Sequence, residues 1–75
     1  MTGRESIGLA DLELLTTRIA AGLVVARPGC RLEISTYVWN RNSFDAQHRL
    51  EEACKTHGIE FEVREQIGDV EWVCP

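Results

Sequence analysis

The chain has 75 residues, of which 44% are hydrophobic and 27% charged, and its formal net charge is −4. This composition is typical of an ordered globular protein, and the length allows one domain, residues 1–75. No apolar run approaches the roughly 20 residues of a membrane span, and the first residues lack the pattern of a secretory signal. We therefore expect a cytoplasmic protein that makes no membrane contact.

The acidic charge is concentrated at the end of the chain. Residues 59–75 contain five acidic residues and one arginine, whereas acidic and basic residues balance in residues 1–29. A basic footprint for a phosphate backbone is missing, so direct binding of nucleic acid is not expected.

Residues 8–26 are predicted to form the first helix, which Pro28 and Gly29 end. Apolar residues recur at intervals of three and four and gather on one face: Leu12, Leu15, Ile19, Leu23 and Ala26. A second apolar group lies about opposite, and it predicts a contact with another subunit or a partner: Leu14, Ala21 and Val25. The alternative interpretation makes residues 23–26 a strand.

Residues 31–39 alternate between the two faces of a predicted strand. A polar link follows at residues 40–42, and Ser43 is a suitable N-cap for a second helix. That helix is predicted to run to His57, where Gly58 supplies the left-handed stop.

Residues 59–74 predict a hairpin of two alternating strands with a turn near residues 67–69. The expected fold is therefore α+β, with element order α-β-α-β-β and two helices packed on one face of a three-stranded sheet. The residues expected to face the helices are Leu32, Ile34, Val38, Ile59, Phe61, Val63, Val70 and Trp72.

The other face of this sheet is expected to be uncovered. It would carry Glu33, Tyr37, Trp39, Glu60, Glu62, Arg64, Glu71 and Val73. Glutamate is a poor strand former, so the presence of four glutamates on this face needs an explanation. One explanation is solvation of an exposed face. The other explanation is recognition, in which the two aromatic residues anchor a partner and the carboxylates meet its arginines and lysines.

The link between the predicted strand and the second helix is a further candidate contact region. Trp39, Arg41 and Phe44 would have the composition of an interaction hot spot if they are exposed. The alternative is a hydrophilic turn in which Phe44 packs locally. Together with the open face, the predicted partner-binding residues are Glu33, Tyr37, Trp39, Arg41, Phe44, Glu60, Glu62 and Glu71.

Catalysis is not expected, because the chain has no phosphate-binding loop, dinucleotide turn, nucleophile elbow or zinc-protease motif. The three cysteines, Cys30, Cys54 and Cys74, are interpreted as reduced thiols, with Cys74 the most reactive. Cys54 and His57 lie three residues apart on one helix and make a single close ligand pair, whereas structural zinc sites normally have two. We therefore predict neither a metal site nor a cofactor.

In its size, single domain, acidity and lack of catalytic motifs, the whole chain resembles anti-CRISPR inhibitors. The resemblance is one of general type and is carried by no shared motif, so it implies no site residues. It implies a phage or mobile-element protein that binds a host nucleic-acid-handling complex, with carboxylates occupying sites that would otherwise hold phosphates. The alternative is a homodimeric structural or regulatory module, joined through Leu14, Ala21 and Val25, whose acidic face is merely solvated.

Overall fold

The fold is seen in a computed structural model that describes residues 3–65 and 68–75. The elements in chain order are β1 (Gly3–Ser6), α1 (Leu12–Ala20), β2 (Arg31–Ser35), α2 (Thr36–Arg41), α3 (Phe44–Thr56), β3 (Phe61–Arg64) and β4 (Val70–Cys74). The expected α+β class is confirmed, but the described residues form four strands and three helices rather than three and two. None of these helices has the length and apolar composition needed to span a bilayer.

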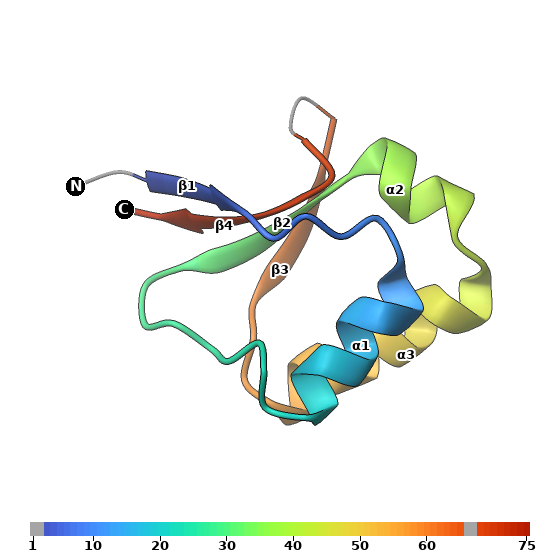
Figure 1. Ribbon diagram of the computed structural model, residues 1–75, viewed down its shortest axis with the longest axis horizontal. Helices are drawn as coiled ribbons and strands as arrows, with labels where there is room; N and C mark the ends of the chain where they lie inside the picture. Colours follow the sequence, from blue (N-terminus) through green and yellow to red (C-terminus); the bar gives the residue numbers. More distant parts are fainter. Residues whose placement is uncertain (1–2, 66–67) are drawn as a thin grey trace.

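The four strands form one mixed sheet in the order β1-β4-β2-β3 (Figure 1). Strand β3 runs parallel to β2, with Phe61 opposite Leu32, whereas β4 runs antiparallel on the other side of β2, with Trp72 opposite the same leucine. The expected hairpin over residues 59–74 is therefore wrong, because β2 lies between its two strands. Of the predicted turn, Ile67 lies outside the described residues.

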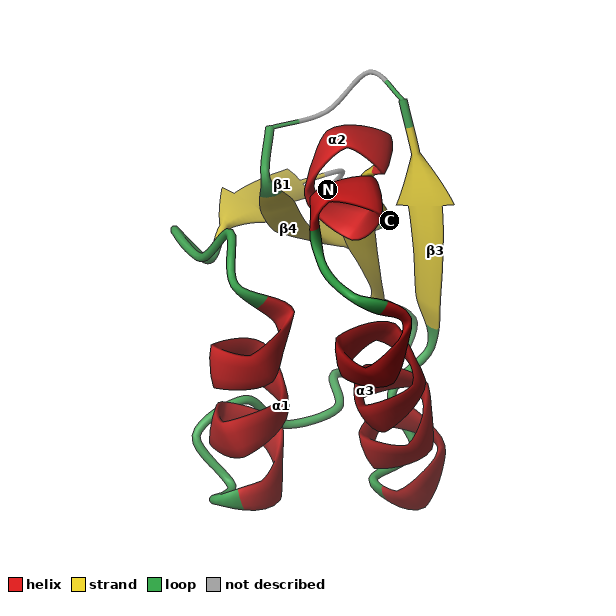
Figure 2. Ribbon diagram, turned by 90° about the vertical axis from the view of Figure 1, so that its right-hand side faces the viewer, coloured by secondary structure: helices red, strands yellow, loops and turns green. Residues whose placement is uncertain are grey.

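Helices α1 and α3 lie side by side on one face of the sheet, as expected, and α2 lies at the end of β2 (Figure 2). The core fills the space between helices and sheet, and its fully buried members include Leu12, Leu15, Ile19, Leu32, Ile34, Val38 and Leu50. Among the residues predicted to face the helices, Phe61 and Val63 are only half-buried, because they lie on edge strand β3.

Helix α1 is shorter at both ends than the predicted 8–26. Asp11 is its N-cap and accepts hydrogen bonds from the amides of Glu13 and Leu14. Gly22, with φ 77°, turns the chain into the left-handed region, and the amide of Leu23 donates to the carbonyl of Arg18. Residues 21–30 form neither the predicted helix nor the alternative strand, and Leu23 is 76% exposed instead of buried.

Helix α2 replaces the second half of the strand predicted over residues 31–39. The hydroxyl of Ser35 accepts a hydrogen bond from the amide of Val38 at 3.1 Å and so caps a new helix. Val38 remains in the core as predicted, because a short helix can also direct one residue inward. Tyr37 and Trp39, however, no longer lie on the open face of the sheet.

Helix α3 confirms the prediction made from its local signals. Ser43 caps its first turn by accepting from the amide of Ala46. At the other end Gly58 has φ 68°, and the amide of Ile59 donates to the carbonyl of Cys54 at 2.8 Å, as in a Schellman ending.

Strand β1 was not predicted, because all four of its residues are exposed and show no apolar alternation. It pairs antiparallel with β4, with Glu5 opposite Trp72. The pairing covers the outer edge of β4 and places the two ends of the described chain side by side (Figure 1).

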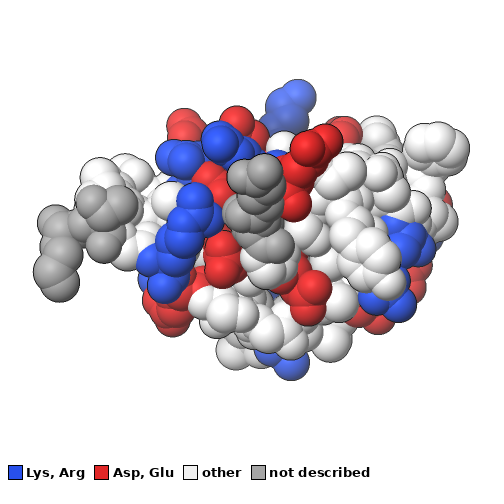
Figure 3. Space-filling view, turned by 90° about the horizontal axis from the view of Figure 1, so that it is seen from above, with Lys and Arg blue, Asp and Glu red and all other residues white. Residues whose placement is uncertain are grey.

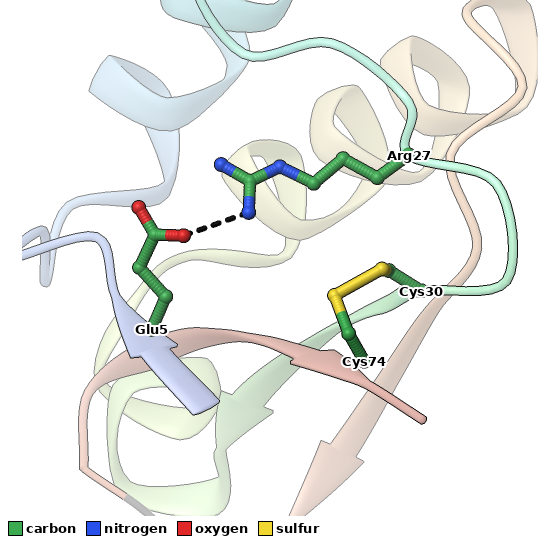
Figure 4. The surroundings of a disulfide bond; sticks show 4 residues. All are labelled: Glu5, Arg27, Cys30 and Cys74. Atoms are coloured by element: carbon green, nitrogen blue, oxygen red, sulfur yellow. Dashed lines mark hydrogen bonds and ion pairs between the residues drawn. A yellow bond between two sulfur atoms is a disulfide. The ribbon is translucent and has the colours of Figure 1, made fainter. Parts of the chain in front are cut away.

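A disulfide joins Cys30 to Cys74 across the end of the β2–β4 ladder (Figure 4). The interpretation of all three cysteines as free thiols, with Cys74 reactive, is therefore wrong; Cys54 alone of the three is free, and it is buried. Beside the disulfide, Arg27 pairs with Glu5 at 2.7 Å and places its guanidinium over the ring of Trp72. These contacts hold residues 21–30 against the sheet without regular secondary structure.

Removing the disulfide should lower stability substantially. Because Cys30 and Cys74 are 44 residues apart, loop-closure entropy predicts that a Cys30→Ser, Cys74→Ser variant loses about 4 kcal/mol of unfolding free energy. Urea denaturation with and without a reducing agent measures this. Reductant should bring the wild type to the stability of the variant and leave the variant unchanged; equal stabilities of variant and oxidised wild type would contradict the assignment.

Candidate functional site

The open face of the sheet carries a group of alternating charges, here called the sheet-face network. Its members come from all four strands: Arg4, Arg31, Glu33, Glu62, Arg64 and Glu71. Arg4 of β1 donates from Nη1 to Glu33 Oε1 at 3.0 Å and to Glu71 Oε1 at 3.1 Å. One arginine of edge strand β1 thereby links the neighbouring strand β4 and the next strand, β2.

Arg31 extends the network to the other edge of the sheet. Its Nη2 lies 2.7 Å from Glu33 Oε2, and its Nε lies 3.2 Å from Glu62 Oε2. Glu62 is in turn 3.5 Å from Nη1 of Arg64, on the same strand. Figure 3 shows the acidic and basic side chains interleaved on this side of the molecule.

Glu33 lies at the centre of the network and its side chain is fully buried. Burial alone would raise the pKa of this carboxyl group. Hydrogen bonds from Arg4 and Arg31, and the charges of the same two residues, outweigh burial and hold the pKa below its ordinary value. Glu33 is therefore a buried structural anion, and a partner cannot reach it without displacing two arginines.

The predicted acidic recognition face is thus not a row of free carboxylates. Glu33, Glu62 and Glu71 are each paired with arginine, so the six members of the network balance three against three. Sequence reasoning missed this because Arg4 lies in a strand without an apolar pattern. The position of Arg31, two residues before Glu33 on one strand face, was the available signal. Glu60 is the exception, because it is exposed and forms no ion pair with the residues that the structure describes.

The two aromatic residues predicted for this face lie on α2 instead. Trp39 is half-buried, and its ring packs against Phe61 of β3 with centroids 5.8 Å apart. It therefore extends the core. Tyr37 faces solvent, with 69% of its surface exposed.

A groove of about 630 Å³ lies between the start of α1 and the link from α2 to α3. Asn42, which lines it, holds the two sides together. Its Oδ1 accepts from the amide of Leu12 at 3.3 Å, and its Nδ2 donates to the carbonyls of Val38 at 2.7 Å and Ala10 at 3.4 Å. Sequence reasoning treated this asparagine only as part of a polar link.

Gln47 of α3 fixes the other side of the link. Its Nε2 donates to the carbonyl of Trp39 at 2.7 Å and to that of Asn42 at 3.5 Å. The backbone between α2 and α3 is consequently bonded to both helices and to the start of α1. Side chains that project from this link stand on a fixed support.

Tyr37 and Arg41 of α2 and Phe44 of α3 lie on the two helices that this link joins, and we call these three residues the aromatic surface. Phe44 is 88% exposed, more than any other large hydrophobic residue that the structure describes. The guanidinium of Arg41 lies over the ring of Tyr37, 5.2 Å from its centroid. Arg41 is also one of the residues that line the groove. The predicted contact region of residues 39–44 is thus exposed at Arg41 and Phe44, while Trp39 is not part of it.

The proposed dimer residues Leu14, Ala21 and Val25 do not share a helix face. Leu14 lies on α1, is 40% exposed and lines the groove. Ala21 is the C-cap, and Val25 belongs to the irregular segment beyond Gly22. The predicted face depended on a helix continuing to residue 26, which Gly22 prevents.

Within residues 3–65 and 68–75, no three histidine, cysteine or acidic side chains are placed to hold a metal ion. Cys30 and Cys74 are joined in the disulfide and so offer no thiolate to a metal ion. Burial raises the pKa of the remaining thiol, Cys54, to about 11, so it is protonated at neutral pH.

Comparison of the chain with protein-family models, with curated proteins and with solved structures finds no match. The groove, the aromatic surface and the charges of this chain are the features that bear on its function.

The sheet-face network should make stability depend on acid pH. The pKa of Glu33 is lower in the folded state than in the unfolded state, where a glutamate has a pKa of about 4.3. Its contribution is complete above that value and is lost as the pH falls through the folded pKa. Thermal unfolding of wild type and Glu33→Gln between neutral pH and pH ~2 measures this; the variant should be less stable at neutral pH by about 1–3 kcal/mol, with a smaller further loss in acid. Parallel curves would contradict the assignment.

Asn42 should be important for stability although it is a link residue. An Asn42→Ala variant leaves the carbonyl of Val38 and the amide of Leu12 without their side-chain partner, so we expect a loss of about 1–3 kcal/mol in urea denaturation. The neighbouring Asn40→Ala change, at an exposed position, is the matched control and should change stability by less than about 0.5 kcal/mol. Equal effects of the two changes would contradict the anchoring role.

Proposed function

We propose that the chain is a non-catalytic protein-binding module whose contact surface is the aromatic surface together with the adjoining groove. The observation that carries the proposal is the exposure of Tyr37 and Phe44, 69% and 88%, within the eight residues 37–44, where Arg41 also lies over the ring of Tyr37. Tyrosine and arginine are enriched among the residues that dominate binding energy at interfaces. Exposed aromatic residues in one small region of a soluble domain are also typical of contact sites.

The rigidity of the support strengthens the proposal. Binding costs free energy when side chains or loops must be ordered, and a preorganised surface avoids part of that cost. Asn42 and Gln47 bond the α2–α3 link to its surroundings, and the stacking of Arg41 on Tyr37 orients both side chains. The groove beside them offers space for an apolar side chain of a partner, next to Leu14 and Ala46.

The proposal moves the contact surface away from the sheet. In the sheet-face network, opposing charges already satisfy the carboxylates that a basic partner would have to reach. The wider expectation, a phage inhibitor of the anti-CRISPR kind that acts on a nucleic-acid-handling complex, rests on size and charge and stays a prediction. Of the carboxylates it invoked on the sheet, Glu60 is the one that is exposed outside the network.

The cytoplasmic location also stays a prediction, and the disulfide bears on it. Disulfides are rare in reducing compartments and persist in oxidising ones. The bond between Cys30 and Cys74 therefore favours an oxidising setting for the folded chain.

The test is capture of partners from bacterial lysate by the wild type and by matched variants. A Tyr37→Ala, Phe44→Ala variant should lose the partner that the wild type retains, because loss of a hot-spot residue costs about 2 kcal/mol, roughly thirty-fold in affinity. Leu23→Ser, a change at another exposed apolar residue remote from the aromatic surface, is the control and should retain the partner. Isothermal titration with the identified partner then gives the affinities.

A third variant distinguishes the two surfaces. If Glu60→Lys, Glu71→Lys loses the partner while Tyr37→Ala, Phe44→Ala retains it, the acidic sheet face is the active surface and the proposal is wrong. Circular dichroism and thermal unfolding of each variant show whether the fold is intact.

A further inference from the structure

Strand β3 is an edge strand of the sheet, because among the described strands only β2 pairs with it. The amide of Leu32 donates to the carbonyl of Glu60 at 2.8 Å, which sets the register of the parallel β2–β3 ladder. Since backbone groups alternate in direction along a strand, Glu62 and Arg64 direct theirs towards β2, and Phe61 and Val63 direct theirs outward. Among the described residues, no hydrogen bond uses these outward groups.

The edge also leaves apolar surface to bury. Phe61 and Val63 are half-buried on the helix side of β3, whereas Glu62 and Arg64 are exposed on the open face. The strand has only four residues and carries two charged side chains, but it contains no proline, lysine or bulge that would prevent pairing at its edge. It can therefore accept another strand.

We propose that β3 pairs antiparallel with β3 of a second copy of this chain, with Val63 opposite Val63 of the second copy. The amide and carbonyl of each valine, which point away from β2, then bond to those of the other valine. In the same register Glu62 lies directly opposite Arg64 of the second copy, and the two-fold axis repeats this pair. The two sheets become one sheet of eight strands, with helices on one side and charges on the other.

The charge pattern selects this register among those that pair outward groups with outward groups. Centring the pairing on Glu62 places Glu60 opposite Arg64 twice but also places Glu62 opposite itself. Centring it on Arg64 places that arginine opposite itself. Centring on Phe61 places Glu60 opposite Glu62 twice. Only the register centred on Val63 has two opposite-charge pairs and no like-charge pair directly across the interface.

The other edge of the sheet does not offer the same match. In β1, the amide of Ile7 donates to the carbonyl of Val70, so Arg4 and Ser6 direct their backbone groups outward. Pairing outward residues of two copies can never place Arg4 opposite Glu5, because the two differ by one position along the strand. Self-pairing is therefore specified at β3 and not at β1.

Sedimentation equilibrium over a dilution series of the intact, oxidised protein tests the proposal with two single variants. In homodimers Glu62→Lys would place lysine opposite arginine, and Arg64→Glu would place glutamate opposite glutamate, so each should dimerise roughly ten-fold or more weakly than the wild type. Mixed with each other, the two variants restore both opposite-charge pairs. The mixture should therefore form a heterodimer about as well as the wild type forms its homodimer.

A Val63→Pro variant tests the backbone contact. Proline lacks the amide that would cross the interface, and the outward amide of Val63 makes no bond within the sheet, so the fold should persist while the dimer is lost. Circular dichroism checks the fold, and the two charge variants decide the matter if this one does not fold. A wild type that is monomeric at every concentration would overturn the proposal. So would single variants that dimerise like the wild type, or a mixture that stays monomeric.

Discussion

The buried carboxylate of Glu33 is the interaction on which the sheet depends. It lies on β2, which has β4 on one side and β3 on the other, and its two oxygens are bonded by arginines of β1 and of β2 itself. From there the sheet-face network reaches Glu71 on β4 and Glu62 on β3. A buried charge is strongly unfavourable without partners, so this arrangement requires all four strands to be in their observed register.

A second constraint compensates for the small size of the domain. A chain of this length buries too little apolar surface to be robustly stable on its core alone, and small domains commonly add a covalent link. The Cys30–Cys74 bond closes the end of the β2–β4 ladder. Together with the Glu5–Arg27 pair and the position of Arg27 over Trp72, it orders a ten-residue segment that has no helix or strand of its own.

The surface of the molecule contains two regions of different character. The open face of the sheet is internally neutralised, which fits a supporting role, whereas α2 and the start of α3 present aromatic side chains on a hydrogen-bonded platform. The edge of β3 adjoins the open face, because Glu62 and Arg64 belong to the sheet-face network, but the groups that would bond to another strand are backbone amides and carbonyls. The dimer would use backbone groups of β3 and the binding proposal uses side chains of α2 and α3, so different variants test the two proposals.

The sequence alone determined the elements that depend on local signals. Helix α3 was predictable because Ser43 and Gly58 act on the turns beside them, and the alternation of Leu32 and Ile34 identified β2 because it needs only a period of two. Tertiary structure decided the rest. The sequence of residues 36–39 fits a strand or a short helix equally well, and the choice is made when the hydroxyl of Ser35 caps α2 by accepting from the amide of Val38. The pairing of β1 with β4, the insertion of β2 between β3 and β4, and the meeting of Cys30 with Cys74 all join residues far apart in the chain, and no local pattern encodes which distant strand a given edge will meet.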